Sequence, residues 1–385
     1  MNMIKLIPDI LPFPDGAESS PFFGALASAL MPALGFTAET PFFCDPKQSF
    51  CIECGGCNRT TLQKHRYRLY HDLQSYTGVS LGWAWPEENS DYQTMPGWYK
   101  GWRWPDEFFA FIFGFTGISW KRLRTGTDRD VIFSEVRKSV DAGMPVLMKL
   151  GDGPDWHVVT GYGDADAGGA YVLYGYDSHN HFDHTMRPTK DVVAAQGYTD
   201  NGLFILSDWF KHFRDAIIIV GRTPKTVGYG DIVDRAIETL EHPAHERLKK
   251  DLMERLDGVT HENARATAEW LLGIVGFPIE ARWHFAESNL HYHCENEEAK
   301  EKIFGIIRQY VFDSEHDATH GTCWKIWAQL GVGTHTGYAL PPNAGDLLEK
   351  SETRAELKRL FEIVFYNDRV VLDLLREARA ALRRA

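Results

Sequence analysis

The stretch DAGMPVLMKLGDGPDWHVVTGYGDADAGGAYVLYGYD, residues 141–177, decides the fold. It contains three candidate strands, PVLMKL, HVVTGYG and AYVLYGYD, and a fourth, AIIIVGR, follows at 216–222. A continuously apolar run such as IIIV is typical of a central strand that is covered on both faces. His157 opens the second strand and Asp177 closes the third. We therefore expect an imidazole and a carboxylate to meet at the edge of one sheet.

Such a pair suits general-base catalysis, because the carboxylate holds the imidazole in one tautomer and stabilises the imidazolium that forms. The chemistry also needs a nucleophile. The most economical one is a Cys or Ser at the N-terminus of a helix packed across the sheet, where the helix dipole favours a thiolate. The alternative interpretation of His157 is a structural histidine whose polar atoms are satisfied in the core.

Helical patterns precede and follow these strands. The sequence predicts helices at 21–35, 60–78 and 128–142, the last with Thr127 as its N-cap. Beyond Pro224 the chain consists of helical segments with little strand material between them. We expect a mixed α+β domain at 1–224 and an all-helical domain at 225–385.

Composition excludes several classes of partner. The chain has 385 residues, a formal net charge of -12 and no basic cluster, which argues against binding to nucleic acid or to an anionic membrane. No apolar stretch approaches the roughly 20 residues of a membrane-spanning helix. The N-terminus lacks the continuous apolar core of a signal peptide. The expected location is the cytoplasm.

Four cysteines lie close together, in FFCDPKQSFCIECGGC: Cys44, Cys51, Cys54 and Cys57. In a reducing compartment this clustering indicates metal ligation or thiol chemistry in preference to disulfides. Four thiolates are sufficient for one tetrahedral zinc ion, although the usual second pair of ligands at a distance is missing. The alternative is a loop of free thiols. No cofactor is required by the other motifs, so zinc is the one candidate.

Residues 141–177 resemble the His and Asp half of the papain-like, bacteriocin-processing cysteine peptidases. In that family a G-x-P-V strand precedes an H-x-V-V-x-G-Y motif and a strand that ends in Asp; here HVVTGY is one residue shorter. With its helical second half, the chain is more similar still to the butirosin-biosynthesis acyltransferase-like proteins. The resemblance covers about residues 15–222. It implies a papain-like, cysteine-peptidase-like domain followed by an all-helical domain, with His157 as general base and Asp177 as its orienting carboxylate.

The nucleophile of the family does not carry over. The family has a Cys at the start of the first helix, where this chain has SSPFFGALASAL, so Phe22 or Phe23 occupies the place. A phenyl ring can neither attack a carbonyl nor donate to an oxyanion, and no upstream Gln supplies an oxyanion donor. The remaining candidates for the attacking group are Ser19, Ser20, Cys54 and Cys57. Cys57 has the advantage that GGCNRTT leads into a helix.

Three functions follow from these patterns. The first is a thiol peptidase or acyltransferase that uses Cys57, His157 and Asp177 on a peptide or on a small acyl or amide substrate. The second is a catalytically inactive papain-like module that binds a peptide or small amide ligand. The third is an interaction protein stabilised by zinc at the four clustered cysteines.

Overall fold

The computed structural model describes residues 4–11, 21–42, 59–82, 105–151, 156–163, 172–176, 204–206, 209–288, 290, 294–312, 318–333 and 339–384. Contacts divide the chain into two compact units. The first comprises Met1–Leu73 and Phe109–Thr226, and the second comprises Gln74–Phe108 and Val227–Ala385. The chain therefore passes into the second unit close to residue 224, the position where the composition changes.

The division differs from the predicted one because the segment 74–108 belongs to the second unit. Two hydrogen bonds show why. The Ser75 hydroxyl donates to the carbonyl of His284 (3.2 Å), and Arg282 Nη2 donates to the carbonyl of Leu81 (3.3 Å). All four residues are buried, so residues 74–82, the described start of this segment, form part of the core of the helical unit. Such long-range contacts leave no periodic trace in the sequence.

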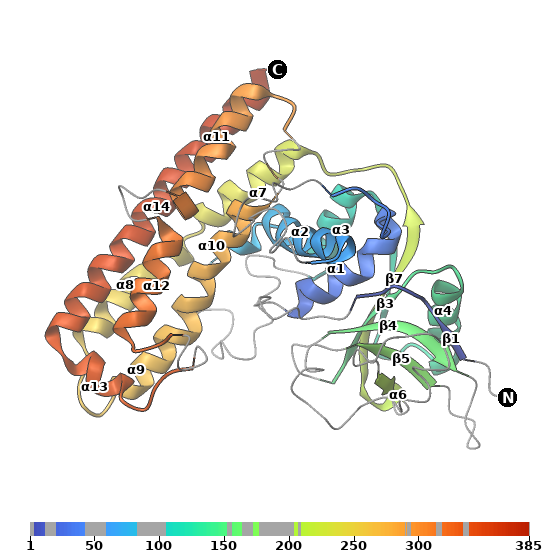
Figure 1. Cartoon of the computed structure of the whole chain (residues 1–385), viewed down its shortest axis with the longest axis horizontal. Coiled ribbons are helices and arrows are strands. Elements are labelled where there is room, and N and C mark those ends of the chain that lie inside the picture. The colour runs from blue at the N-terminus through green and yellow to red at the C-terminus, as the bar shows by residue number, and fades with distance from the viewer. Residues whose placement is uncertain are drawn as a thin grey trace. The chain divides into compact units, whose positions relative to one another are not determined.

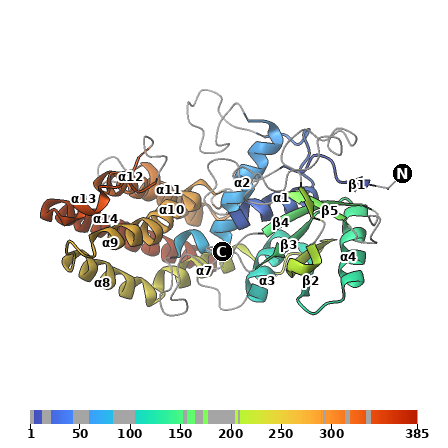
Figure 2. The same cartoon turned by 90° about the horizontal axis from the view of Figure 1, so that it is seen from below.

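The first unit is mixed α and β. Its elements are β1 (Ile4–Leu6), α1 (Pro21–Leu34), most of α2 (Thr61–Tyr76), most of α3 (Pro105–Thr116), β2 (Ile118–Arg124), α4 (Arg129–Asp141), β3 (Val146–Leu150), β4 (Trp156–Gly163), β5 (Val172–Tyr176), β6 (Phe204–Leu206), α6 (Trp209–His212) and β7 (Phe213–Arg222). The described strands form one antiparallel sheet in the order β2-β7-β3-β4-β5-β6, and β1 pairs with β4. In Figures 1 and 2 the strands lie between α1 and α3 on one side and α4 on the other.

Two predicted helices in this unit are confirmed, with one correction. Helix α1 ends before Gly35, whose φ of 79° is readily adopted only by a residue without Cβ. Helix α4 begins one residue later than its predicted cap implied. Asp128 is the N-cap and accepts from the backbone N–H of Asp130 (2.8 Å), whereas the Thr127 hydroxyl donates backwards to the carbonyl of Arg124 (2.8 Å). A carboxylate at the positive end of the helix dipole explains the preference.

The second unit is helical in its described residues. Its elements are η1 (Val79–Leu81), α7 (Tyr229–Glu241), α8 (Ala244–Asp257), α9 (Ala264–Trp270), the π-helical η3 (Leu271–Gly276), α10 (Phe277–Glu287), α11 (Glu297–Ile307), the π-helical η5 (Arg308–Phe312), α12 (Thr319–Gln329), α13 (Ala344–Glu349) and α14 (Ser351–Arg384). The long helix α14 lies against α7, α11 and α12, while α8 and α13 contact it near one end (Figure 1). Among the helices of the described ranges, none has the length and apolar character needed to cross a bilayer.

An ion pair is buried at the centre of this unit. Arg282 of α10 is inaccessible to solvent and donates to both carboxylate oxygens of Asp368 on α14, at 2.7 and 2.5 Å. The hydroxyl of Tyr310, in η5, donates to the same carboxylate at 3.0 Å. A π-helical turn changes the direction in which its side chains point, and here η5 supplies this third partner. The cluster thus joins α10, η5 and α14.

Removing one partner of this pair should destabilise the protein more than removing both. We expect Arg282→Met to lower the free energy of unfolding by about 3–5 kcal/mol, because it leaves the Asp368 carboxylate buried without its counter-charge. The double variant Arg282→Met/Asp368→Leu should recover a large part of that loss. Urea denaturation followed by circular dichroism measures both. Arg369→Gln, at an exposed arginine stacked on Tyr366, is the matched control; equal losses in the single and double variants would contradict the interpretation.

Two buried histidines make the unit sensitive to acid. Burial lowers the pKa of His284, and of His245, from 6.5 to about 3. Between these values the unfolded chain binds protons that the folded chain excludes, so the free energy of unfolding must fall as the pH falls below 6.5. The expected slope is about 1.4 kcal/mol per pH unit for each histidine.

The substitution His284→Leu should remove one such contribution. Between pH 6 and 5 we expect the slope of unfolding free energy against pH to fall by about 1.4 kcal/mol per unit, as measured by urea titrations at several pH values. Val131→Ala, at an exposed position of the first unit that does not titrate, should leave the slope unchanged. If His284→Leu and the wild type showed parallel pH profiles, His284 would not be neutral in the folded chain.

Candidate functional site

The start of β4 organises two rows of side chains across the sheet. Lys149 lies directly opposite Trp156, and Asp215 lies directly opposite both Lys149 and Arg124. These four residues come from four neighbouring strands. Directly opposite residues of an antiparallel pair project to the same face of a sheet, so they form one row across that face. We call it the polar row.

The next position along each strand gives a second row on the opposite face. His157 is paired with Met148, Met148 with Ala216, and Ala216 with Leu123. All four are buried, and His157 is only 6% exposed. Because successive side chains of a strand point to opposite faces, His157 and Trp156 face away from each other. His157 is therefore the single polar member of an apolar row.

Helices α1 and α3 cover the face that carries the polar row. The ring of Phe22, in the first turn of α1, lies 5.6 Å from the ring of Trp156 between centroids, in an edge-to-face arrangement. Phe109 of α3 lies 6.0 Å from the same indole and 6.1 Å from Phe22. Edge-to-face contacts of this kind add to the energy of burial. The start of α1 thus belongs to an aromatic cluster.

Helix α4 covers the other face. Lys121 and Leu123 are two residues apart on β2 and so share a face, and Lys121 Nζ lies 3.2 Å from Glu135 Oε2 of α4. That face also carries His157. Helix α1 thus packs on the Trp156 side of the sheet, whereas the strand register leaves His157 on the α4 side.

The aromatic residues at the start of α1 are fully integrated in the core. Phe22 is 2% exposed and Phe23 is inaccessible, and their ring centroids are 5.3 Å apart. The resemblance placed these residues where a nucleophile would stand. In the described part of the chain, this place is filled by packed phenyl rings.

The polar row holds an ion pair at the edge of this core. Arg122 lies on the same face as Arg124, and its Nε donates to both oxygens of Asp215, at 3.0 and 2.9 Å. Its guanidinium carbon also lies 6.0 Å from the centre of the Phe109 ring. Lys149, half-buried, is the cross-strand neighbour of Asp215. Opposite charges in such positions stabilise a sheet.

Sequence reasoning overlooked Trp156, Lys149 and Asp215. One signal was present, because Asp215 is a carboxylate placed directly before the apolar run AIIIV. A charge at the start of a central strand indicates a partner on a neighbouring strand. Which strand supplies that partner depends on the sheet order, which the sequence does not contain.

Several predicted site residues lie outside the described residues: Ser19, Ser20, Cys44, Cys51, Cys54, Cys57 and Asp177. The described part of β5 ends at Tyr176, which lies opposite Val158. The pairing of His157 with Asp177 and the four-cysteine zinc site remain predictions. Among the described residues, no three His, Cys, Asp or Glu side chains are grouped so as to hold a metal ion.

Comparisons with known proteins add no relative. No family model matches the chain, and no significant match was found among the curated proteins or the solved structures.

The aromatic cluster predicts a measurable contribution from Phe22. We expect Phe22→Ala to lower the free energy of unfolding by about 3–5 kcal/mol, because it removes a buried ring and leaves a cavity beside Trp156. Chemical denaturation followed by tryptophan fluorescence measures the change. Val131→Ala, at a 47% exposed position of α4, should change stability by less than about 0.5 kcal/mol. A Phe22→Ala protein as stable as this control would show that the cluster is not packed as described.

Proposed function

We propose that the chain is a catalytically inactive papain-like protein whose first domain binds a peptide or a small amide ligand without converting it. The observation that carries the proposal is the contact between Phe22 and Trp156, with ring centroids 5.6 Å apart. In a papain-like enzyme the start of the first helix supplies the attacking thiolate. Here that position supplies a side chain without a nucleophilic atom.

The orientation of His157 supports the same proposal. A general base must come within hydrogen-bond reach, about 2.6–3.2 Å, of the proton that it removes. His157 belongs to the row that α4 covers, whereas the start of α1 lies on the other face. A nucleophile introduced at position 22 would therefore be separated from the imidazole by the sheet.

The polar row offers groups that suit ligand recognition. Lys149 is half-buried and Arg124 is exposed, whereas Asp215 is buried and its carboxylate already accepts from Arg122. The ammonium group of Lys149 carries three N–H donors, which suit an amide carbonyl or a carboxylate. Binding without turnover needs no oxyanion hole and no base. The proposed ligand is accordingly one with exposed amide or carboxylate groups.

The alternative, a thiol peptidase or acyltransferase, rests on Cys57 as the nucleophile, and the zinc-stabilised interaction protein rests on the four clustered cysteines. An activity assay separates the first from our proposal. The intact protein, Cys57→Ala and His157→Gln should all release p-nitrophenol from p-nitrophenyl acetate at the same rate as buffer with bovine serum albumin. Turnover by the wild type that is lost in both variants would establish the enzyme and refute the binding module.

Position 22 provides a sharper test. Phe22→Cys places a thiol where the papain-like family has its nucleophile, but we expect its reaction with iodoacetamide to be slower than that of free cysteine, because the site is buried and the imidazole faces the other way. Mass spectrometry of the alkylated peptide gives the rate, with Val131→Cys as an exposed control thiol. Rapid alkylation that disappears in Phe22→Cys/His157→Gln would show that His157 does reach the start of α1.

Binding itself is tested with short acetylated peptide amides. We expect saturable binding by isothermal titration calorimetry, weakened in Lys149→Gln and unchanged in Lys138→Gln, an exposed lysine on α4. If no peptide of a broad pool bound to the protein, the proposed function would be refuted.

A further inference from the structure

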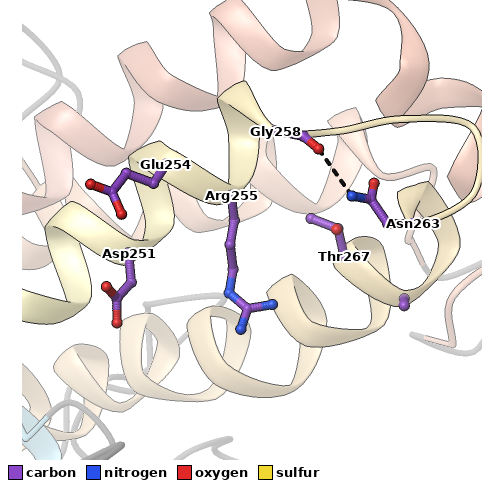
Figure 3. A pocket seen from close by; sticks show the side chains of 7 residues that line it. Asp251, Glu254, Arg255, Gly258, Asn263 and Thr267 are labelled. Carbon is purple, nitrogen blue, oxygen red and sulfur yellow. Dashed lines mark hydrogen bonds between the residues drawn. The ribbon is translucent and has the colours of Figure 1, made fainter.

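A pocket of about 520 Å³ lies between α8 and α9 of the second unit. Its lining residues are Asp251, Glu254, Arg255, Gly258, Asn263, Ala266 and Thr267. Its volume falls within the range of about 300–1,000 Å³ that small-molecule sites usually have. In Figure 3 Asp251 and Arg255 extend from α8 on the same side of the helix, while Asn263 and Thr267 face them from the start of α9.

Arg255 is held in place but is not neutralised. Its guanidinium carbon lies 4.6 Å from the centre of the Trp270 ring, a cation–π contact. Within the described ranges Arg255 makes no hydrogen bond and no ion pair with another side chain. The stack fixes the plane of the guanidinium and leaves its N–H donors available. Such a fork matches the two oxygens of a carboxylate.

Asp251 provides the opposite charge on the same wall. It precedes Arg255 by four residues, the spacing at which an acid and a base on a helix ordinarily pair. The described residues nevertheless contain no ion pair between the two, and none between Asp251 and any other base. The neighbouring Glu254 differs, since its carboxylate lies 3.7 Å from Lys250 Nζ. Two opposite charges that are not paired with each other therefore line one pocket.

Two hydrogen bonds hold the turn that forms the opposite wall. Asn263 Nδ2 donates to the carbonyl of Gly258 at 2.9 Å, as Figure 3 shows, and Asn263 Oδ1 accepts from the backbone N–H of Thr260 at 2.8 Å. These two bonds hold the turn between α8 and α9 in shape. A pocket whose walls are already ordered loses little conformational entropy when it binds a ligand.

We propose that this pocket binds a small zwitterion, a free α-amino acid, with its carboxylate on Arg255 and its ammonium group on Asp251. A simple anion would meet the carboxylates of Asp251 and Glu254, and a simple cation would meet the guanidinium, so each is disfavoured relative to a molecule that carries both charges. The pocket belongs to the second unit and involves no residue of the polar row. The inference is independent of the proposed function.

Isothermal titration calorimetry of the intact chain tests the proposal with glycine, L-alanine, L-leucine, acetate and methylammonium at millimolar concentration. We expect at least one amino acid to bind, and acetate and methylammonium to bind about tenfold more weakly or less. Arg255→Gln and Asp251→Asn should each weaken amino-acid binding about tenfold or more, because each leaves one charge of the ligand without its counter-charge.

Two control variants make the same changes of charge at positions outside the pocket. Arg369→Gln removes an exposed guanidinium that is also stacked on a ring, that of Tyr366, and Glu262→Gln removes an exposed carboxylate outside the pocket. Both should bind as the wild type does, and circular dichroism should show unchanged helix content in all four variants. The proposal fails if no amino acid binds, if acetate binds as tightly as glycine, or if the pocket variants behave like the controls.

Discussion

The alternation of side chains along β4 is the constraint on which the first unit depends. Trp156 and His157 are neighbours in sequence, and the pleat of the strand sends them to opposite faces of the sheet. The indole becomes part of the core under α1 and α3, and the imidazole enters the apolar row under α4. A shift of one residue in register would exchange the two. The face that His157 occupies is therefore a property of strand pairing, and it decides which helix the imidazole can meet.

The start of α1 is occupied by apolar side chains. A reactive thiol at a helix N-terminus must stay accessible and must face its base, and both needs keep polar surface in the core. Phe22 and Phe23 instead complete an aromatic cluster with Trp156 and Phe109. The gain is burial of apolar surface. The binding role proposed for this domain requires only the polar row at the margin of that cluster.

The arginines discussed above differ in whether a carboxylate of the fold pairs with them. Arg122 with Asp215 in the first unit, and Arg282 with Asp368 in the second, are guanidinium–carboxylate pairs that neutralise each other within the fold. Such pairs specify how strands or helices fit together, and they leave little to offer a ligand. Arg255 is different, because it stacks on an aromatic ring and has no ion-pair partner among the described residues. That difference, and not the presence of an arginine, distinguishes a candidate binding group from a structural one.

Local patterns were sufficient to predict the mixed first part, the helical second part, the strands β3, β4, β5 and β7, and the extents of α1, α2 and α4 to within a few residues. These features depend on periodicity and on residues such as Gly35 that act within one turn. That the start of α1 matches the nucleophile position of the papain-like family remains a prediction. Strand β2 was overlooked because its basic residues interrupt the apolar pattern. Two of them, Arg122 and Lys121, form ion pairs with Asp215 of β7 and Glu135 of α4. Tertiary structure alone decided the register, the face occupied by His157 and the assignment of residues 74–108 to the helical unit, because each depends on partners that are distant in the chain.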